Sequence, residues 1–219
     1  MSAKYRAVCF DLDGTLLDTL ADLADSANRA LAEHNLPVHP TEAYRYFVGD
    51  GMRMLARRIV PQDQRENDEL TEKIFHAARA QYAKRWAEKT RPYDGIPQLL
   101  DELTRRRVKM AVLSNKPLDF AELCVAELLP HWKFDLVLGV NDNVPPKPDL
   151  AGIQAVAASL NIPPAEFIYV GDTATDMKTA VAGGMFPVGV LWGFRQADEL
   201  LRNGAKVLIE KPQDLLSLL

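Results

Sequence analysis

Two spacings of apolar residues divide the chain. From about position 88 onward, short apolar segments alternate with segments of helical spacing, and one further apolar segment stands alone at Tyr5–Phe10. The apolar segments are rich in residues that favour strands, and turn-forming residues follow them. Strands that alternate with helices predict βαβ units, and therefore a parallel sheet with helices on both faces. The expected strands are residues 5–10, 108–114, 134–139, 167–172, 187–192 and 206–210.

The segment between the first strand and position 88 has a different pattern. Apolar residues recur there at helical spacing, as at Leu20, Leu23 and Ala27, and Gly49–Gly51 interrupts the pattern. No part of this segment indicates a strand. We therefore expect an α/β fold in which residues 1–15 and 88–219 form a Rossmann-like parallel core. Residues 16–87 would form a small α-helical domain inserted after the first strand.

Composition restricts the class of protein. The chain has 219 residues, 47% of them hydrophobic, and a formal net charge of −4, so a packed core is expected and a nucleic-acid partner is not. We see neither a charged-then-apolar leader nor an apolar run of about 20 residues, so we expect no membrane partner and a cytoplasmic location. Cys9 and Cys124 lie among apolar residues and are expected to be buried thiols.

Polar residues that could bind ligands or take part in catalysis follow the predicted strands. Their positions are Asp11 and Asp13 after the first strand, Ser114 and Asn115 after the second, Lys147 after the third, and Asp172 and Asp176 after the fourth. Open parallel sheets bind ligands outside the carboxyl ends of their strands. Carboxylates suit Mg²⁺, whereas lysine and hydroxyl groups suit phosphoryl oxygens. A magnesium ion beside a phosphate would also explain how two buried acids can lie close together while ionised.

Each of these signals has an ordinary structural alternative. An Asp-x-Asp pair occurs by chance, Ser-Asn-Lys after a strand is commonly a turn or a cap, and a lysine between prolines is commonly an exposed loop residue. The acid three residues after a Gly-Asp-Thr is commonly part of a helix N-terminus. What indicates a functional site is therefore that all four signals occur together, each at the end of an expected strand.

The four segments together resemble the motifs of one family. FDLDGTLLDT, VLSNK, PPKPD and GDTATDM are similar, in this order, to the four motifs of the haloacid dehalogenase-like hydrolases. The resemblance covers essentially the whole chain, and residues 16–87 are similar to the family's small α-helical cap domain. Within the family, the inserted helices and the segment GGMFPVGVLWGF look most like the phosphoglycolate phosphatase-like group.

The resemblance implies a role for each residue. Asp11 would be the nucleophile that forms an aspartyl-phosphate, and Asp13 would protonate the leaving alcohol and then activate water. The side chains of Asp11 and Asp172 and the backbone carbonyl of Asp13 would bind Mg²⁺. Asp176 would act through water or orient the other groups. Ser114, Asn115 and Lys147 would bind the phosphoryl oxygens.

The implied function is a Mg²⁺-dependent phosphomonoesterase acting on a small phosphorylated metabolite, with 2-phosphoglycolate as the leading substrate. Asp13 favours a phosphate monoester or a phosphomutase, because family members that remove halides lack this second acid. A sugar phosphomutase of the β-phosphoglucomutase type, a pyrophosphatase and a non-enzymatic receiver-like domain are the alternatives. A monomer or a homodimer is expected.

The cap domain is expected to select the substrate. Gly49 and the residues after it break the helical pattern, and Arg53 follows. In one interpretation, this loop closes over the site and Arg53 meets a substrate carboxylate or phosphate. In the other, it is an ordinary turn between helices with a solvated arginine.

Overall fold

The computed structural model describes residues 4–219, which form two compact units. One unit contains the chain up to Leu17 together with Pro92–Leu219, and the other contains Asp18–Arg91. The sequence pattern predicted boundaries at 15/16 and 87/88. The prediction that residues 16–87 contain no strand was wrong, because β2 (Leu17–Asp18) pairs with β3 (Arg91–Pro92). Both strands are too short to produce a recognisable alternation of apolar and polar residues.

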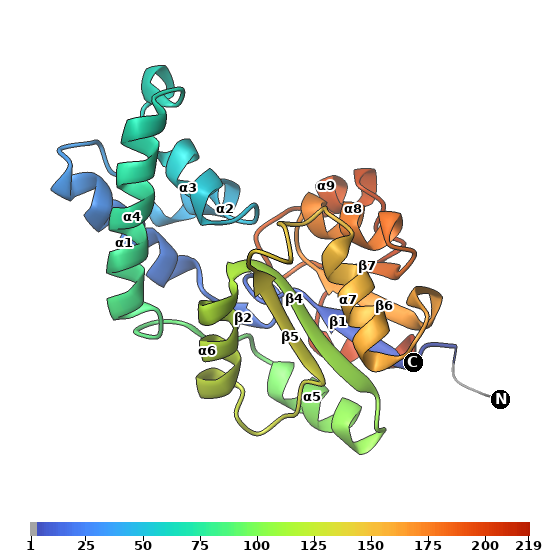
Figure 1. Cartoon of the computed structure of the whole chain (residues 1–219). Coiled ribbons are helices and arrows are strands. Elements are labelled where there is room, and N and C mark those ends of the chain that lie inside the picture. Colours follow the sequence, from blue (N-terminus) through green and yellow to red (C-terminus); the bar gives the residue numbers. More distant parts are fainter. Residues whose placement is uncertain (1–3) are drawn as a thin grey trace. The chain divides into compact units, whose positions relative to one another are not determined.

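The first unit is built on a six-stranded sheet (Figure 1). Its strands lie in the order β5-β4-β1-β6-β7-β8, and each adjacent pair is parallel. They are β1 (Ala7–Phe10), β4 (Lys109–Pro117), β5 (Leu136–Val140), β6 (Phe167–Gly171), β7 (Phe186–Val190) and β8 (Val207–Ile209). The order places β1 and β6, both fully buried, in the middle of the sheet.

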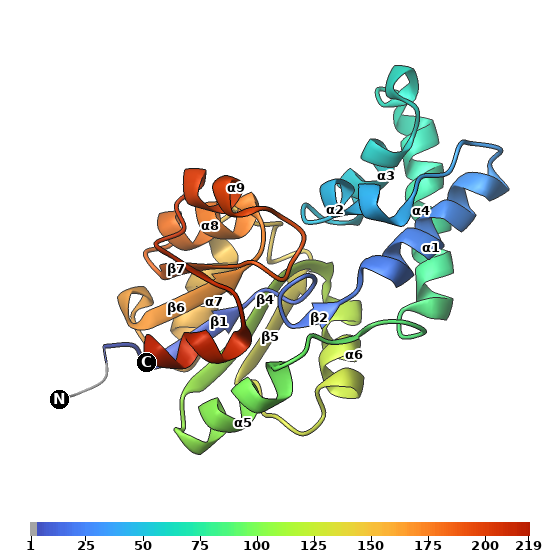
Figure 2. The ribbon, with the colours of Figure 1, turned by 180° about the vertical axis from the view of Figure 1, so that it is seen from behind.

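Helices cover both faces of this sheet, as expected for an α/β fold. The helices are α5 (Ile96–Arg105), α6 (Leu118–Leu128), α7 (Ala151–Leu160), α8 (Ala174–Ala182) and α9 (Ala197–Arg202), with 3-10 turns η3 (Pro164–Glu166) and η4 (Pro212–Ser217). Helices α7 and α8 lie on the face seen in Figure 1, whereas α5 and η4 lie on the face seen in Figure 2. On the α7 face, Cys9, Leu113 and Tyr169 pack in one core with Ile153.

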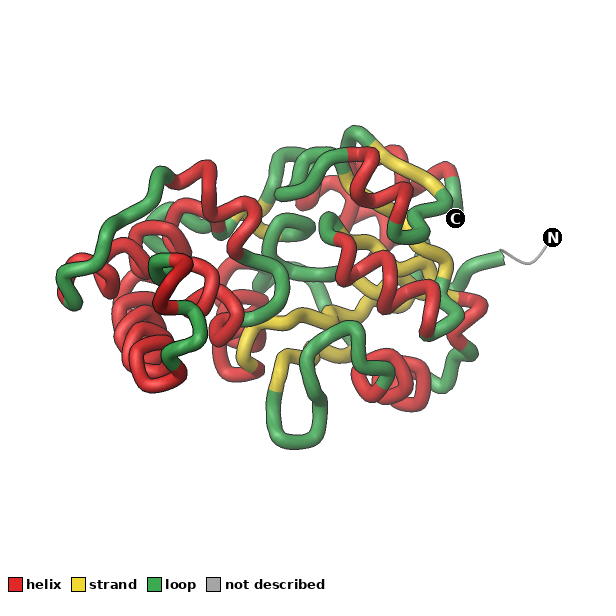
Figure 3. The backbone as a smooth tube through the Cα atoms, turned by 90° about the horizontal axis from the view of Figure 1, so that it is seen from above, coloured by secondary structure: helices red, strands yellow, loops and turns green. Residues whose placement is uncertain are grey.

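The second unit consists almost entirely of helices and loops (Figure 3). Its elements are α1 (Leu20–Glu33), η1 (Thr41–Ala43), α2 (Tyr44–Phe47), α3 (Met52–Ile59), η2 (Gln62–Gln64) and α4 (Asp68–Arg85). Leu23, Ala27 and Leu31 lie on the buried side of α1, as their helical spacing predicts. Asn67 caps α4 by accepting a hydrogen bond from the Leu70 backbone N–H at 3.0 Å.

A local irregularity in β4 affects the edge of the sheet where the site lies. The register between β4 and β5 is regular up to Leu113 and shifts before Pro117, so the segment 114–116 bulges. Gly139 on β5 allows this, because a Cβ at Gly139 would lie 2.5 Å from the Lys116 carbonyl oxygen. Strand β4 therefore runs beyond Ser114, where sequence analysis expected it to end.

The described helices contain no candidate for a membrane span. None of those within residues 4–219 is both long and apolar enough to cross a bilayer.

Candidate active site

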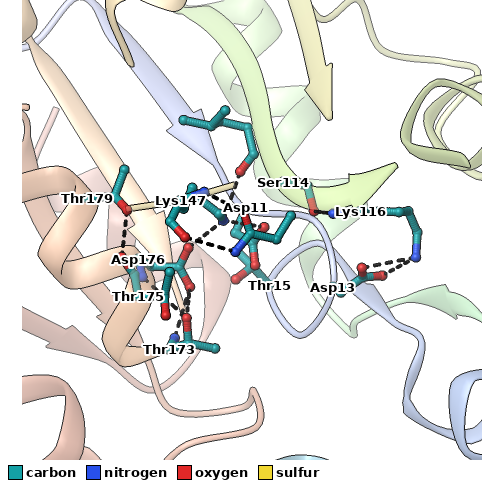
Figure 4. Close-up of polar contacts among 12 residues, drawn as sticks. Asp11, Asp13, Thr15, Ser114, Lys116, Lys147, Thr173, Thr175, Asp176 and Thr179 are labelled. Atoms are coloured by element: carbon teal, nitrogen blue, oxygen red, sulfur yellow. Dashed lines mark hydrogen bonds and ion pairs between the residues drawn. The ribbon is translucent and has the colours of Figure 1, made fainter. Parts of the chain in front are cut away.

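The register of the parallel strands brings the first two acids together. Phe10 pairs with Val112 of β4 and with Val170 of β6, so the residues that follow these strands emerge at one edge. Asp11 and Asp172 therefore lie near each other although they are far apart in the sequence. Both are buried, and so is Asp176 on the first turn of α8. Figure 4 shows Asp11, Lys147 and Asp176 grouped at this edge.

Lys147 stands between two of the acids. Its Nζ donates to Oδ1 of Asp11 at 2.8 Å and to Oδ1 of Asp176 at 2.7 Å. It also lies 3.0 Å from the Leu113 carbonyl oxygen and 3.2 Å from the Tyr169 hydroxyl. Burial lowers the pKa of Lys147, but Asp11 and Asp176 outweigh this effect and hold that pKa well above its ordinary value. The lysine is therefore a permanent positive charge inside an acidic cluster.

Asn115, near the carboxyl end of β4, holds the backbone of Lys147 in place. The side-chain Oδ1 of Asn115 accepts a hydrogen bond from the Lys147 backbone N–H at 2.7 Å, and its Nδ2 donates to the Lys147 carbonyl at 3.4 Å. The Ser114 Oγ accepts from the Lys116 backbone N–H at 3.3 Å. Asn115 thus fixes the loop that carries the lysine.

Both carboxylate oxygens of Asp176 accept hydrogen bonds from protein groups. Oδ2 accepts from the backbone N–H and the hydroxyl of Thr173, at 3.0 and 2.6 Å, and completes a capping box at the start of α8. Oδ1 accepts from Lys147 and, at 3.2 Å, from the Tyr169 hydroxyl. The N-cap interpretation and the functional interpretation of this acid are therefore compatible, because the cap holds the carboxylate that contacts Lys147.

Asp172 is held by two donors from other segments. Its Oδ1 accepts from the Thr15 hydroxyl at 3.2 Å and its Oδ2 accepts from the Phe194 backbone N–H at 2.8 Å. A Cβ at Gly193 would lie 2.3 Å from the Asp172 Cβ, so only glycine allows the chain to pass this closely. Burial, together with the charges of Asp176 and Asp11, holds the pKa of Asp172 well above its ordinary value.

The three acids form a site that fits a metal cation. Asp11, Asp172 and Asp176 can each offer one oxygen such that all three oxygens lie within 4.8 Å of one another. Burial raises the pKa of Asp11 to about 7, although Lys147 acts to lower it, and the charge of Asp176 adds to the increase. Since carboxylate crowding disfavours ionisation, a cation bound by these oxygens would relieve a repulsion that Lys147 alone leaves in place.

Asp13 points in another direction. Both of its carboxylate oxygens accept from the Nζ of Lys116, at 2.9 and 3.0 Å. Figure 4 shows this pair apart from the group formed by Asp11, Lys147 and Asp176. Asp11 and Asp13 thus diverge because a turn follows Asp11, in which Gly14 has a φ of +86°.

Gly49 and Arg53 belong to the second unit. Gly49 and Gly51 have φ values of +114° and +86°, which explains the break between α2 and α3. Arg53 forms an ion pair with Glu72, and its guanidinium lies 4.3 Å from the centre of the Phe75 ring. The sequence grouped both residues with the site, whereas the contacts described for Arg53 lie within its own unit.

Four residues of the site were not among those expected from the sequence: Thr15, Lys116, Tyr169 and Thr173. Thr15 and Lys116 stand inside the recognised motifs, so their position was a usable signal. Tyr169 lies in a buried strand and fits its apolar pattern, so the sequence does not indicate that its hydroxyl forms hydrogen bonds in the site.

The family model described as haloacid dehalogenase-like hydrolase matches residues 8–190. "Phosphoglycolate phosphatase 1" of Pseudomonas aeruginosa is 32% identical over 96% of this chain and 78% of its own length. "N-acetylmuramic acid 6-phosphate phosphatase" of the same organism is 30% identical over 99% of this chain and 95% of its own. The crystal structure of a "putative phosphoglycolate phosphatase" from Lactobacillus delbrueckii has a TM-score of 0.90 at 29% identity, and the match covers 97% of both chains.

The chain therefore belongs to the haloacid dehalogenase-like hydrolases, as its motifs, its parallel sheet and the acids at its strand ends indicated. Its relatives and the cluster at the sheet edge identify it more closely as a phosphatase.

Proposed function

We propose that this protein is a Mg²⁺-dependent phosphomonoesterase that works through an aspartyl-phosphate on Asp11. Its first candidate substrate is the small organophosphate 2-phosphoglycolate. The observation that carries the proposal is the contact between the Asp11 carboxylate and the buried Lys147 ammonium, beside two further acids. The names of two relatives support a phosphate ester of a small metabolite but point to different esters.

The chemistry proposed for Asp11 proceeds in two displacements. One of its oxygens forms a bond to phosphorus while the bond from phosphorus to the ester oxygen breaks, and Asp13 gives a proton to the departing alcohol. Asp13 then takes a proton from water, whose oxygen attacks the phosphorus while the bond from phosphorus to the Asp11 oxygen breaks, which releases phosphate and restores the Asp11 carboxylate. Lys147 and the Ser114 hydroxyl would hold the phosphoryl oxygens, so that their partial charges are stabilised as the bonds change.

Asp11 and Asp172, with the backbone carbonyl of Asp13, would hold Mg²⁺ in this proposal. The ion would supply positive charge against the phosphoryl oxygens and the crowded carboxylates. Thr15 and the Phe194 backbone N–H orient Asp172. Asp176 would act on the ion indirectly, because each of its oxygens already accepts two hydrogen bonds from protein groups, whereas each oxygen of Asp172 accepts one.

The helical domain, which sequence analysis assigned to 16–87 and the contacts assign to Asp18–Arg91, is proposed to act as a cap that selects the substrate. Gly49 would let its loop take the required backbone path, and Arg53 would meet a negative group of the substrate. In that case Arg53 would have to leave Glu72, with which it is paired in the structure.

The direct test is phosphate release from a panel of esters that includes 2-phosphoglycolate, N-acetylmuramic acid 6-phosphate, pyrophosphate and β-glucose 1-phosphate. Each is assayed with Mg²⁺ and with EDTA, for wild type and for Asp11→Asn. We expect release that requires Mg²⁺ and is lost in Asp11→Asn. Formation of an isomer without free phosphate would favour the phosphomutase alternative. Absence of turnover with every ester would favour the receiver-like alternative and overturn the proposal.

A further inference from the structure

The proposed reaction requires the contact between Lys116 and Asp13 to change. Its side chain is only 3% exposed and that of Asp13 is 18% exposed, and the two meet through both carboxylate oxygens. Buried charges require partners, because an ammonium removed from water loses its hydration. The resting arrangement thus satisfies Lys116 by engaging the acid that has to serve the leaving group.

This arrangement is built into the backbone. The bulge at 114–116 determines where Lys116 leaves β4, and Gly139 permits its close approach to β5, since a Cβ there would lie 2.5 Å from the Lys116 carbonyl oxygen and 2.6 Å from the Leu118 Cα. Asp13 stands on the turn after β1, with Gly14 at a positive φ. Two separate backbone features therefore bring the pair together.

Asp13 cannot deliver a proton to a leaving oxygen while both of its oxygens accept from Lys116. Figure 4 shows its carboxylate directed at Lys116 and apart from Asp11. The carboxylate has to part from Lys116 and take up a proton from water before it can donate that proton to the ester oxygen next to Asp11. When it does so, the Lys116 ammonium loses the carboxylate with which it forms its ion pair, and the phosphoryl group is already assigned to Lys147 and Ser114.

We propose that Lys116 is a specificity-determining residue that exchanges Asp13 for a second anionic group of the substrate, and thereby releases Asp13 for proton transfer. This inference rests on the proposed function. It defines the substrate class as phosphate monoesters that carry a carboxylate close to the ester oxygen. An ester with a neutral group there can bind through its phosphate but leaves Asp13 held by Lys116.

The test compares 2-phosphoglycolate with 2-hydroxyethyl phosphate, which has the same carbon skeleton but no carboxylate. The variants are Lys116→Met, Lys116→Arg and, as a matched loss of one exposed charge, Lys178→Met on α8. We expect Lys116→Met to lower kcat/KM for the anionic ester about 10- to 100-fold. For the neutral ester kcat should stay within about threefold of wild type or increase, because Asp13 is no longer held. Lys116→Arg should recover part of the loss, and Lys178→Met should match wild type on both esters.

A binding measurement separates failure of this inference from failure of the proposed function. Calorimetric titration in Mg²⁺ uses 3-phosphonopropionate, in which CH₂ replaces the ester oxygen, and the neutral 3-hydroxypropylphosphonate. We expect Lys116→Met to weaken only the carboxylate-bearing phosphonate, by about 10-fold or more. If wild type hydrolyses neither ester but shows this preference, the proposed function fails and the role of Lys116 in recognition stands. Equal losses on both esters and both phosphonates would overturn the role of Lys116.

Discussion

Replacing Asp176 by asparagine keeps the shape of the side chain and removes its charge. In the structure this buried carboxylate accepts four hydrogen bonds, two from Thr173 and one each from Lys147 and Tyr169. An asparagine can present its oxygen to Thr173 or to Lys147, but its NH₂ group then faces the donors on the other side. The variant therefore loses the ion pair in either orientation, and it also loses either the cap of α8 or the hydrogen bond from Lys147.

The magnitude follows from these contacts. Losing a hydrogen bond to a charged group costs about 1.5–3 kcal/mol, and losing an N-cap costs about 1 kcal/mol. Lys147 keeps Asp11 as a partner, so the larger cost of a buried ion left with no partner does not apply. Part of this is offset, because the charge of Asp176 also repels Asp172 and Asp11. We expect a net decrease of about 2–4 kcal/mol in the free energy of unfolding, equivalent to a Tm lower by about 4–16 °C.

The assay is urea denaturation followed by circular dichroism in EDTA, so that metal binding does not contribute. Asp149→Asn is the matched control, because Asp149 is exposed and accepts a hydrogen bond from the Ala151 N–H at 2.8 Å near the start of α7. Asparagine caps helices as well as aspartate does, so this control should change stability by less than about 0.5 kcal/mol. A loss for Asp176→Asn no larger than that of the control would refute the reasoning about the buried network.

Three further perturbations address the rest of the site. Gly193→Ala would place a Cβ 2.3 Å from the Asp172 Cβ, so calorimetry should show Mg²⁺ affinity at least about 10-fold weaker. Asn115→Ala removes the acceptor of the Lys147 backbone N–H and should lower kcat/KM about 10- to 100-fold by displacing the lysine. Because the pKa of Asp11 is raised to about 7, the metal-free fold binds more protons than the unfolded chain, and its stability should decrease as pH rises from about 4 to about 7. Mg²⁺ should therefore raise the Tm more at pH 8 than at pH 5.

Each of these expectations has an opposite outcome. Unchanged Mg²⁺ affinity in Gly193→Ala would mean that the close approach of Gly193 does not position Asp172 for binding the ion. Wild-type kcat/KM in Asn115→Ala would mean that Lys147 is placed by its ion pairs alone. If the stability of the metal-free protein increased from pH 4 to pH 7, the inference that the buried carboxylates crowd one another would be wrong.

The strand-end residues could be predicted because parallel topology alone brings them to one edge. Asp11 and Asp172 follow strands whose apolar pattern was clear, so their proximity followed from fold class. Lys147 lies in a loop, and its position depends on Asn115, 32 positions earlier in the chain. The sequence could suggest the lysine through its motif but could not show which residue holds it.

The contacts of Lys116 and Tyr169 were not predictable in the same way. The direction of Lys116 depends on a bulge in β4, and the bulge depends on a glycine in the neighbouring strand. Tyr169 is fully buried in β6, and its hydroxyl matters only because Lys147 and Asp176 arrive from other segments. Such contacts are set by tertiary packing, so periodicity carries no signal for them.

The central claim is that Asp11 carries the phosphoryl group during turnover, and one measurement tests it most directly. Wild-type protein is mixed with Mg²⁺ and 2-phosphoglycolate, or with the best ester of the panel, and quenched in acid within milliseconds. Peptide mapping by mass spectrometry then locates any acyl-phosphate. The account predicts a phosphate on the peptide that contains Asp11, absent in Asp11→Asn and absent in EDTA. Rapid turnover with no phosphorylated peptide, or with the phosphate on another residue, would contradict it.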